Sequence, residues 1–454
     1  MEQETIVAIA TASGTGGIGI VRLSGPNALN IGSTITRQNL KPRHAHYCAF
    51  RDKDDNPLDS GICLYFPAPN SFTGEDIVEL QAHGGPLILD IIQREACNLG
   101  ARQAQPGEFS QRAFLNGKID LTQAEAIADL INSATEQAAL NATRSLQGVF
   151  SRKIDVLMDQ VTQLRVYVEA AIDFPEEEID FINNGEVSEK LGAIVKEVDD
   201  ILREAHQGAL IQEGMKVVIA GKPNAGKSSL LNALSGQETA IVTPYEGTTR
   251  DVLKTQIQIE GMPLHIVDTA GLRDSEDIIE QEGIRRAQLE IETADRILLV
   301  VDASTHTTIG FGDESEWLTQ YLQPARKIPV TIVANKCDLT NQPPDVRELD
   351  DFSVVHLSAK TGSGLDVLRD HLKMSMGYRG SGEGRFSARR RHLLSLEKAK
   401  EFLLSAQQQL KGASAGELIA EDLRLCQQSL GEITGAISSD ELLGEIFSSF
   451  CIGK

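Results

Sequence analysis

The sequence feature that most constrains this chain is the stretch GKPNAGKSSL at Gly221–Leu230. The run before it, Met215–Ala220, is short, apolar and β-branched and is typical of a buried strand, whereas Leu230–Leu234 continues with helical character. A glycine-rich loop of the form GxxxxGK[ST] between a strand and a helix predicts a phosphate-binding loop. A chance glycine turn before a helix is the alternative, but three further elements follow in the order that a nucleotide-binding domain requires.

The residue types of this loop suit phosphate and a divalent cation. Gly221 and Gly226 allow the backbone to turn so that successive N–H groups point into one concavity, and the helix N-terminus adds positive potential. We expect Lys227 to reach the β- and γ-phosphates of a nucleotide and the Ser228 hydroxyl to bind Mg²⁺.

The second element is DTAG at Asp268–Gly271, which follows the strand-like run Leu264–Val267. A carboxylate at a strand end can hold the Mg²⁺ shell, and a flexible Gly271 lets its N–H meet a γ-phosphate. DxxG alone is a weak motif, and it gains weight here from its place behind the phosphate-binding loop.

The third and fourth elements select the base. Asn335–Asp338 (NKCD) follows the run Val330–Ala334, and Ser358–Lys360 (SAK) follows Val354–Leu357. Asp338 can accept hydrogen bonds from both N1–H and the 2-amino group of guanine, whereas adenine would leave this carboxylate unpaired. SAK is expected to contact the guanine oxygen through its backbone. The four elements together predict that the nucleotide is GTP.

Composition and charge limit the other possibilities. No apolar run approaches the ~18–20 residues of a membrane span, and the first residues are acidic rather than basic, so we expect a cytoplasmic protein without a signal peptide. The six cysteines are scattered and form no CxxC pair, which indicates neither a disulfide framework nor a zinc site. The net charge of −22 argues against broad nucleic-acid coating, although Arg389–His392 is a local basic patch or a solvated helix start.

Residues 1–118 have an α+β pattern. We expect strands at Thr5–Ala12, Ile18–Leu23, Ile62–Phe66 and Asp76–Gln81 and a helix at Leu87–Leu99. Gly14, Gly16 and Gly19 match the GxGxxG fingerprint of dinucleotide-binding proteins. We reject that interpretation because a strand rather than a helix follows the glycines, which are expected to form a hairpin.

The remainder of the 454 residues predicts two further domains. Residues 119–212 and 379–454 have apolar residues at helical spacing and predict a helical bundle, with an acidic loop or kink at Asp173–Glu178. Residues 213–378 alternate strand and helix as an α/β nucleotide-binding domain, and glycines from position 380 form a linker. The predicted fold is therefore multidomain, with the α/β domain inserted into the helical domain.

The C-terminal sequence FSSFCIGK is unusual because it is apolar to within two residues of the end. Chain ends are commonly polar and frayed, so we expect this one to dock against the body of the protein. Cys451 is then either a small buried hydrophobic residue or a reactive thiol. Lys454 by itself indicates a solvated chain end.

These motifs resemble those of known families. GxPNxGKSS, GTTRD at Gly247–Asp251, DTAGLR and NKCD are similar to the Era-like translational GTPases. SFTGED at Ser71–Asp76, PGEF at Pro106–Phe109, NGK at Asn116–Lys118 and the terminal FCIGK resemble, more narrowly, the bacterial tRNA-modification GTPases called MnmE or TrmE. The resemblance extends over essentially the whole chain.

That resemblance implies a function and partners. Members of the family have a tetrahydrofolate-binding N-terminal domain through which they form homodimers. With a flavoprotein partner, MnmG or GidA, in a heterotetramer, they install an aminomethyl or carboxymethylaminomethyl group at C5 of the tRNA wobble uridine. The one-carbon unit comes from a tetrahydrofolate derivative, in its 5-formyl or methylene form. The family's folate contacts correspond here to Arg22, Glu79, Lys118 and Lys454.

The resemblance also implies how GTP is hydrolysed to GDP and phosphate. Leu272 stands where Ras-like switches have a water-orienting Gln, and no arginine finger is evident. In the similar family K⁺ takes the finger's place, which implies K⁺ ligands at Asn224, Thr243, Tyr245 and Thr248. Thr249 completes the Mg²⁺ shell with Ser228, and Glu280 orients the water, although an exposed helix carboxylate is the alternative for Glu280. The expected GTP-binding residues are Asn224, Ala225, Gly226, Lys227, Ser228, Ser229, Thr243, Pro244, Tyr245, Glu246, Gly247, Thr248, Thr249, Asp268, Thr269, Ala270, Gly271, Asn335, Lys336, Asp338, Ser358, Ala359 and Lys360, with Lys227 and Glu280 catalytic.

Two functions from different classes therefore stand side by side. One is an enzyme whose GTP hydrolysis drives tRNA modification, and the other is an Era-like regulatory switch in ribosome assembly. The second should carry a basic RNA-binding appendage such as a KH domain. The appendages here are an acidic helical region and an α+β region, which favours the first.

Overall fold

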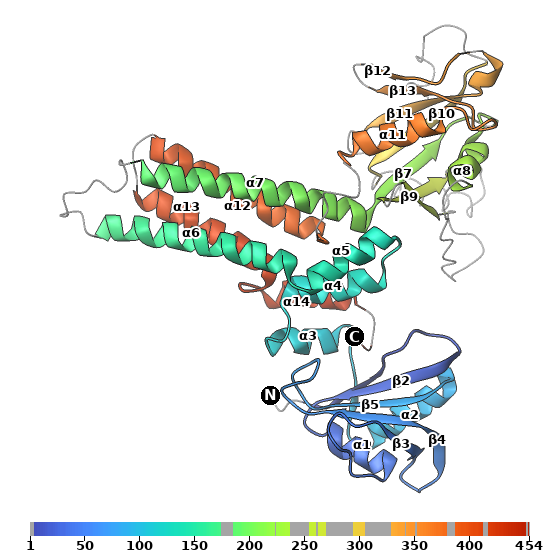
Figure 1. Cartoon of the computed structure of the whole chain (residues 1–454), viewed down its shortest axis with the longest axis vertical. Helices are drawn as coiled ribbons and strands as arrows, with labels where there is room; N and C mark the ends of the chain where they lie inside the picture. Colours follow the sequence, from blue (N-terminus) through green and yellow to red (C-terminus); the bar gives the residue numbers. More distant parts are fainter. Residues whose placement is uncertain are drawn as a thin grey trace, which may run out of the picture. The chain divides into compact units, whose positions relative to one another are not determined.

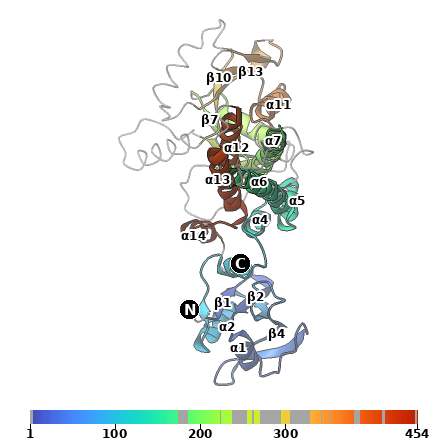
Figure 2. The same ribbon diagram turned by 90° about the vertical axis from the view of Figure 1, so that its left-hand side faces the viewer.

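The computed structural model describes residues 4–173, 185–222, 224–236, 254–259, 262–268, 294–304, 328–340, 342–349, 352–378, 386–411, 416–450 and 453 (Figures 1 and 2). The chain divides into two compact units. The first comprises Met1–Ala128, Ser145–Lys196 and Ser395–Lys454, and the second comprises Asp129–Arg144 and Glu197–Leu394.

The first unit contains a six-stranded sheet in the order β3-β4-β5-β2-β1-β6. All neighbours pair antiparallel except β1 and β6, which are parallel. Helices α1 and α2 contribute buried side chains such as Ile31 and Ile92 to the same core as Val21 and Leu23 of β2. The elements are β1 (Ile6–Ile9), β2 (Gly16–Ser24), α1 (Ala28–Thr36), β3 (His46–Arg51), β4 (Pro57–Phe66), β5 (Ile77–Gly84), α2 (Pro86–Asn98) and β6 (Arg102–Gln103).

The four strands and the helix expected in this region are present, with shifted ends. Gly16 and Gly19 lie within β2, which pairs antiparallel with β1, so the hairpin interpretation is confirmed and the dinucleotide fingerprint has no helix to support it. Helix α1 and strand β3 are additional to the sequence-based prediction. Their apolar residues are widely spaced, as with Cys48 and Phe50 of β3, which alternate with exposed or half-buried neighbours.

The face of this sheet opposite the α1–α2 core carries exposed apolar side chains on β3, β4 and β2. Tyr47, Ile62, Gln81 and Ile20 pair in register across β3, β4, β5 and β2. Tyr47 is 78% exposed and Ile62 is 38% exposed, and Ile18 nearby on β2 is 67% exposed. This row leaves apolar side chains at the surface on a sheet face, where monomeric proteins normally keep polar ones.

Helices make up the rest of the first unit. Helix α6 packs along α13, and Gln427 joins them by accepting from Arg165 Nη1 (2.7 Å) and donating to Thr162 Oγ1 (2.9 Å). Val161, Leu164 and Val168 of α6 are buried at helical spacing, whereas Val156 is exposed because it lies off this buried face. The helices are α3 (Glu108–Leu115), α6 (Val149–Asp173), α13 (Gly416–Thr434) and α14 (Asp440–Ser448), while α4 (Leu121–Ile131), α5 (Glu136–Leu146), α7 (Glu186–Glu213) and α12 (Arg390–Lys411) contribute to both units.

The second unit contains a seven-stranded sheet in the order β12-β13-β11-β10-β7-β9-β8. The five central strands are parallel, and β12 and β8 pair antiparallel at the two edges. Parallel strands covered by helices are the sheet type expected for an α/β domain. The elements are β7 (Met215–Ala220), α8 (Lys227–Ser235), β8 (Lys254–Ile259), β9 (Met262–Asp268), β10 (Arg296–Asp302), β11 (Val330–Asn335), the 3-10 turn η1 (Cys337–Leu339), β12 (Val346–Glu348), β13 (Ser353–His356) and α11 (Leu365–Ser375).

The basic stretch at Arg389–His392 has a structural role at the start of α12. The Arg389 guanidinium lies 2.6 Å from the Asp129 carboxylate, to which Ser387 Oγ also donates. His392 is buried, and its Nδ1 lies 3.0 Å from the Arg389 backbone nitrogen. Arg389 therefore stabilises the beginning of the helix rather than presenting a free cation. None of the described helices is long and apolar enough to cross a membrane.

Candidate functional site

The glycine-rich loop lies between β7 and α8, in the strand–loop–helix context that the sequence predicts. Gly221 has φ of 145° and Gly226, the residue before α8, has φ of 99°. A Cβ on Gly221 would overlap the carbonyl oxygen of Val300, and a Cβ on Gly226 would overlap the side-chain nitrogen of Asn335. Both positions therefore require glycine, for conformation and for space.

The Lys227 ammonium lies over this loop at the N-terminus of α8. Its Nζ donates to the carbonyl oxygens of Gly221 (2.7 Å) and Lys222 (3.0 Å). Ser228 and Ser229 follow in the first turn of the helix and are exposed. A cation, helix N–H groups and a hydroxyl gathered at one helix end can bind a phosphate chain and its cation.

Asn335, at the end of β11, joins three separate loops. Its Nδ2 donates to the Ala225 carbonyl oxygen in the glycine-rich loop (3.0 Å), and its Oδ1 accepts from the Ala359 backbone N–H in SAK (3.0 Å). Asn335 is only 2% exposed, so both bonds are shielded from water. The phosphate-binding loop, NKCD and SAK thus meet at one edge of the sheet, although they are far apart in the sequence.

Lys336 makes a second connection to the phosphate-binding loop, besides that of Asn335. It has φ of 68°, and its Nζ donates to the Asn224 carbonyl oxygen (3.0 Å) and lies 2.5 Å from Asp302 Oδ2. Asp302 was not predicted from the sequence. Burial acts to raise the pKa of this carboxyl, but hydrogen bonds from Lys336 and Ser304 lower it below the usual value. An acid ending an apolar strand, the pattern used to select Asp268, would have identified Asp302.

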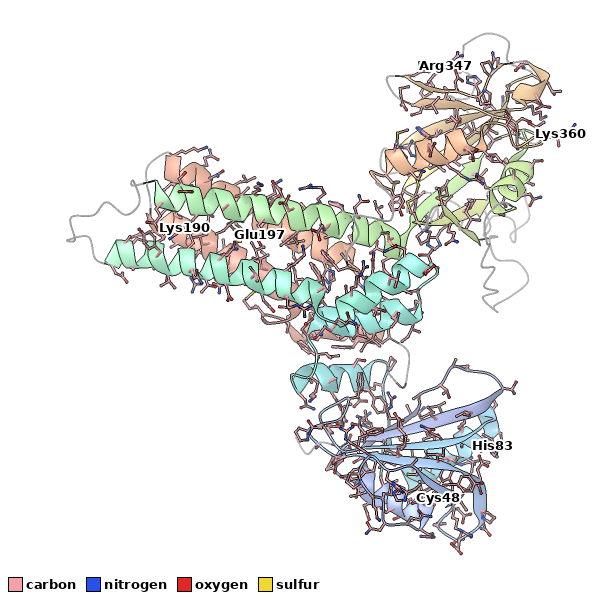
Figure 3. All side chains as sticks on the ribbon, in the orientation of Figure 1. Cys48, His83, Lys190, Glu197, Arg347 and Lys360 are labelled. Carbon is pink, nitrogen blue, oxygen red and sulfur yellow. The ribbon has the colours of Figure 1, made fainter. Side chains whose placement is uncertain are left out.

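The base-recognition residues lie beside this cluster. Asp338 is exposed on the turn η1 that follows Lys336, and Lys360 is exposed at the end of SAK (Figure 3). The SAK loop is closed by hydrogen bonds of the buried Ser358, whose backbone N–H donates to the Ser363 carbonyl oxygen (2.8 Å) and whose Oγ accepts from Thr361 N–H (3.3 Å). Because Asp338 is exposed, its carboxylate is available to a ligand.

Several expected site residues lie outside the described part of the chain. Asp268 ends β9, which pairs in parallel with β7, but its side chain is not described. The others are Thr243, Pro244, Tyr245, Glu246, Gly247, Thr248, Thr249, Thr269, Ala270, Gly271, Leu272 and Glu280 in the nucleotide-binding region and Cys451 and Lys454 at the C-terminus.

A second set of expected residues lies on the N-terminal sheet. Arg22 on β2 and Glu79 on β5 are directly opposite each other in the register, and Arg22 Nε lies 2.9 Å from Glu79 Oε1. The guanidinium also lies 5.8 Å from the ring centre of Phe72 and 5.9 Å from that of Phe109. A carboxylate and a guanidinium beside two aromatic rings can bind a flat, polar heterocycle.

Lys118 lies against the same loop that carries Phe72. Its Nζ donates to the Pro69 carbonyl oxygen (3.0 Å), and a Cβ on Gly74 would lie 3.3 Å from the lysine side chain. Lys118 therefore lies beside both ends of the segment 69–74, and Arg22 lies beside Phe72 within it. The structure brings three of the four expected folate residues to this part of the N-terminal sheet.

The expectation that the C-terminus docks is confirmed for its described residues. Phe447 and Phe450 are buried in a cluster with Leu121 and Ala124. Gly453 has φ of 95°, and a Cβ there would overlap the carbonyl oxygen of Ile9 at the end of β1. Gly453 thus lies against β1, the strand that pairs with β2 and with Arg22 on it.

Comparison with known proteins gives a consistent assignment. A family model described as the MnmE helical domain matches residues 121–451, and one described as the GTP-binding protein TrmE N-terminus matches residues 5–118. A curated protein from Marinobacter nauticus, named tRNA modification GTPase MnmE, is 59% identical, with 99% of each chain covered. One of the same name from Vibrio cholerae serotype O1 is 56% identical over 100% of both chains.

Similar solved structures cover only part of the chain. The crystal structure of an Era variant from Aquifex aeolicus bound to GDP and AlF4⁻ is 27% identical and covers 42% of this chain and 67% of its own. Its TM-score of 0.27 is too low to indicate a common overall architecture.

Proposed function

The chain belongs to the MnmE family of tRNA modification GTPases, and on that premise we propose which reaction it performs and with which residues. It hydrolyses GTP to GDP and phosphate, and with the flavoprotein MnmG it installs an aminomethyl or carboxymethylaminomethyl group at C5 of the tRNA wobble uridine. The observation that carries the nucleotide half of this proposal is Asn335, which joins the phosphate-binding loop to the NKCD and SAK segments.

Lys227 and Ser228 bind the phosphate end of GTP. Lys227 neutralises charge on the β- and γ-phosphates, and Ser228 with Thr249 would hold Mg²⁺, which would supply further positive charge when bound. The donor set fits this role, because Ser228 is exposed beside the Lys227 ammonium at a helix N-terminus. Asp338, exposed beside SAK, accepts from the guanine edge.

Hydrolysis requires positive charge at the transition state in addition to that of Lys227. Asn224, exposed in the loop with φ of 64°, is positioned at the surface of the phosphate cradle and suits a K⁺ ligand with Thr243, Tyr245 and Thr248. These residues would hold K⁺, which when bound would supply the charge that an arginine finger supplies in other GTPases. Glu280 orients the attacking water.

The N-terminal sheet holds the one-carbon donor, a tetrahydrofolate derivative. The pair Arg22 and Glu79 fits it chemically, since a carboxylate can accept from the amino and ring N–H groups of a pterin and the cations Arg22, Lys118 and Lys454 can pair with glutamyl carboxylates. The seat of Gly453 on Ile9 supports a role for the C-terminus in the same site.

The sheet face opposite the α1–α2 core supports a homodimer through the N-terminal domain. Tyr47, Ile62 and Ile18 are exposed apolar side chains on β3, β4 and β2 of one sheet, and pairing two copies would remove them from water. The flavoprotein then completes a heterotetramer that acts on tRNA in the cytoplasm.

The proposed domain division follows the sequence. Residues 1–118 form the folate-binding and dimerisation domain, 119–212 and 379–454 form the helical domain, and 213–378 form the GTPase domain inserted into it. The junctions at β7 and α12 support this division, because the nucleotide-binding sheet begins at Met215 and α12 begins at Arg390.

Analysis of tRNA nucleosides tests the proposal directly. Cells lacking this protein should lose the modified wobble uridines, and the wild-type gene should restore them, whereas Lys227→Ala should not. Normal wobble nucleosides together with a defect in ribosomal subunits would overturn the proposal in favour of an Era-like switch.

A further inference from the structure

Asp302 ends β10 directly opposite Asn335, the residue that joins the three nucleotide-binding loops. Its carboxylate is held on both sides. Oδ1 accepts from the backbone N–H (2.9 Å) and the hydroxyl (2.6 Å) of Ser304, and Oδ2 lies 2.5 Å from Lys336 Nζ. The Ala303 N–H also donates to the Asn335 carbonyl oxygen (2.8 Å), so the acid sits on a fixed strand end.

Lys336, in contrast to the fixed Asp302 carboxylate, has a flexible side chain. A lysine side chain is long and flexible and loses rotamer entropy when it is fixed in one position. Lys336 is nevertheless directed onto the phosphate-binding loop, where its Nζ donates to the Asn224 carbonyl oxygen. The ion pair with Asp302 gives a reason why the ammonium stays there.

We propose that Asp302 is a positioning residue for nucleotide binding, which acts through Lys336 to tie the guanine-recognition segment to the phosphate-binding loop at Asn224. This link is separate from the one that Asn335 makes, because it runs from β10 and ends on a different carbonyl oxygen. The inference rests on the proposed GTP site and adds to it a residue from a strand that carries none of the four nucleotide-binding motifs.

The size of the effect follows from the exposure of the pair. The side chains of Lys336 and Asp302 are 32% and 21% exposed, so their attraction is screened less than that of a surface ion pair but more than that of a buried one. Loss of the pair should weaken binding of GTP and GDP by roughly five-fold, at the upper end of what partly exposed pairs contribute.

A double-mutant cycle tests the proposal with the full-length protein. The affinities of fluorescent GTP and GDP analogues are measured for wild type, Asp302→Asn, Lys336→Met and the double variant. Asp302→Asn should weaken both analogues and raise KM for GTP while leaving kcat nearly unchanged. In the Lys336→Met background the same substitution should have almost no effect, because its partner is already gone.

Two further variants separate positioning from general damage. Asp302→Glu keeps the carboxylate and should recover most of the lost affinity. Asp345→Asn is the matched control, since Asp345 is another part-exposed acid, directly before β12 and paired with His356 and Arg347, and its loss should leave nucleotide affinity unchanged.

The outcomes are distinct. Wild-type affinity in Asp302→Asn, or an equal loss in the presence and absence of Lys336, would overturn the role of Asp302. Failure of the proposed GTP site would appear elsewhere, as an Asp338→Asn variant that keeps its preference for guanine over xanthine nucleotides.

Discussion

Replacing Asn335 with alanine tests whether the three nucleotide-binding loops depend on one side chain. The substitution removes the donor to the Ala225 carbonyl oxygen and the acceptor of the Ala359 N–H. It leaves the backbone pairing of β11 with β10 intact, because the Ala303 N–H bonds to the Asn335 main-chain carbonyl oxygen. The sheet should therefore persist while the loops lose their connection.

The magnitude follows from burial. Ala225 is 4% exposed and Ala359 is 8% exposed, so both orphaned backbone groups remain away from water. A buried polar group left without its partner costs about 1–3 kcal/mol, and two of them give about 2–4 kcal/mol after partial relaxation. A change of 1.4 kcal/mol in binding free energy is a tenfold change in affinity. If the whole destabilisation appears in the free energy of nucleotide binding, affinity should fall by roughly 30-fold to 1,000-fold.

Titration with fluorescent GDP measures this loss. Asn335→Asp keeps the acceptor for Ala359 but sets a carboxylate oxygen against the Ala225 carbonyl oxygen, so it should bind no better than Asn335→Ala. Asn232→Ala, an exposed asparagine of α8, is the control and should bind as the wild type does. A dissociation constant for Asn335→Ala within threefold of wild type would refute the view that this side chain organises the site.

Three more predictions address base choice, hydrolysis and the C-terminus. Asp338→Asn should bind GTP at least tenfold more weakly and prefer xanthosine nucleotides, because an amide offers a donor where guanine needs an acceptor. Competition between GTP and a xanthosine nucleotide measures this preference. Unchanged affinity for GTP would contradict the prediction. Glu280→Ala should keep GTP affinity but lose most turnover, and wild-type hydrolysis should be much faster in K⁺ than in Na⁺, so comparable rates in the two salts would exclude the proposed K⁺ site. Removal of Ile452–Lys454 should leave basal GTP hydrolysis nearly intact, since every nucleotide motif lies between Gly221 and Lys360, but should weaken binding of a reduced folate in calorimetry and abolish tRNA modification. Unchanged folate binding, or a collapse of hydrolysis, would assign the terminus a different role.

The sequence by itself determined the nucleotide-binding half of this protein. Strands β7, β9, β11 and β13 were predicted within a residue or two, because each lies next to a motif that is a short segment whose chemistry is complete in itself. A glycine that must adopt positive φ, a lysine at a helix start and an acid at a strand end are recognisable without knowing their neighbours. The terminal FSSF was likewise recognisable as a docking segment from its composition.

The tertiary structure decided which residues meet. Asp302 contacts Lys336, Arg22 contacts Glu79, and Gly453 rests on Ile9 only after strands have paired in a particular register or the chain end has returned to β1. Such contacts join segments tens or hundreds of residues apart, and nothing in either segment identifies its partner. Helix α1 and strand β3 escaped prediction for a related reason, since their stability comes from packing against β5 and β4 more than from local propensity. Local sequence therefore specified the chemistry of each segment, whereas long-range burial and strand pairing decided which segments act together.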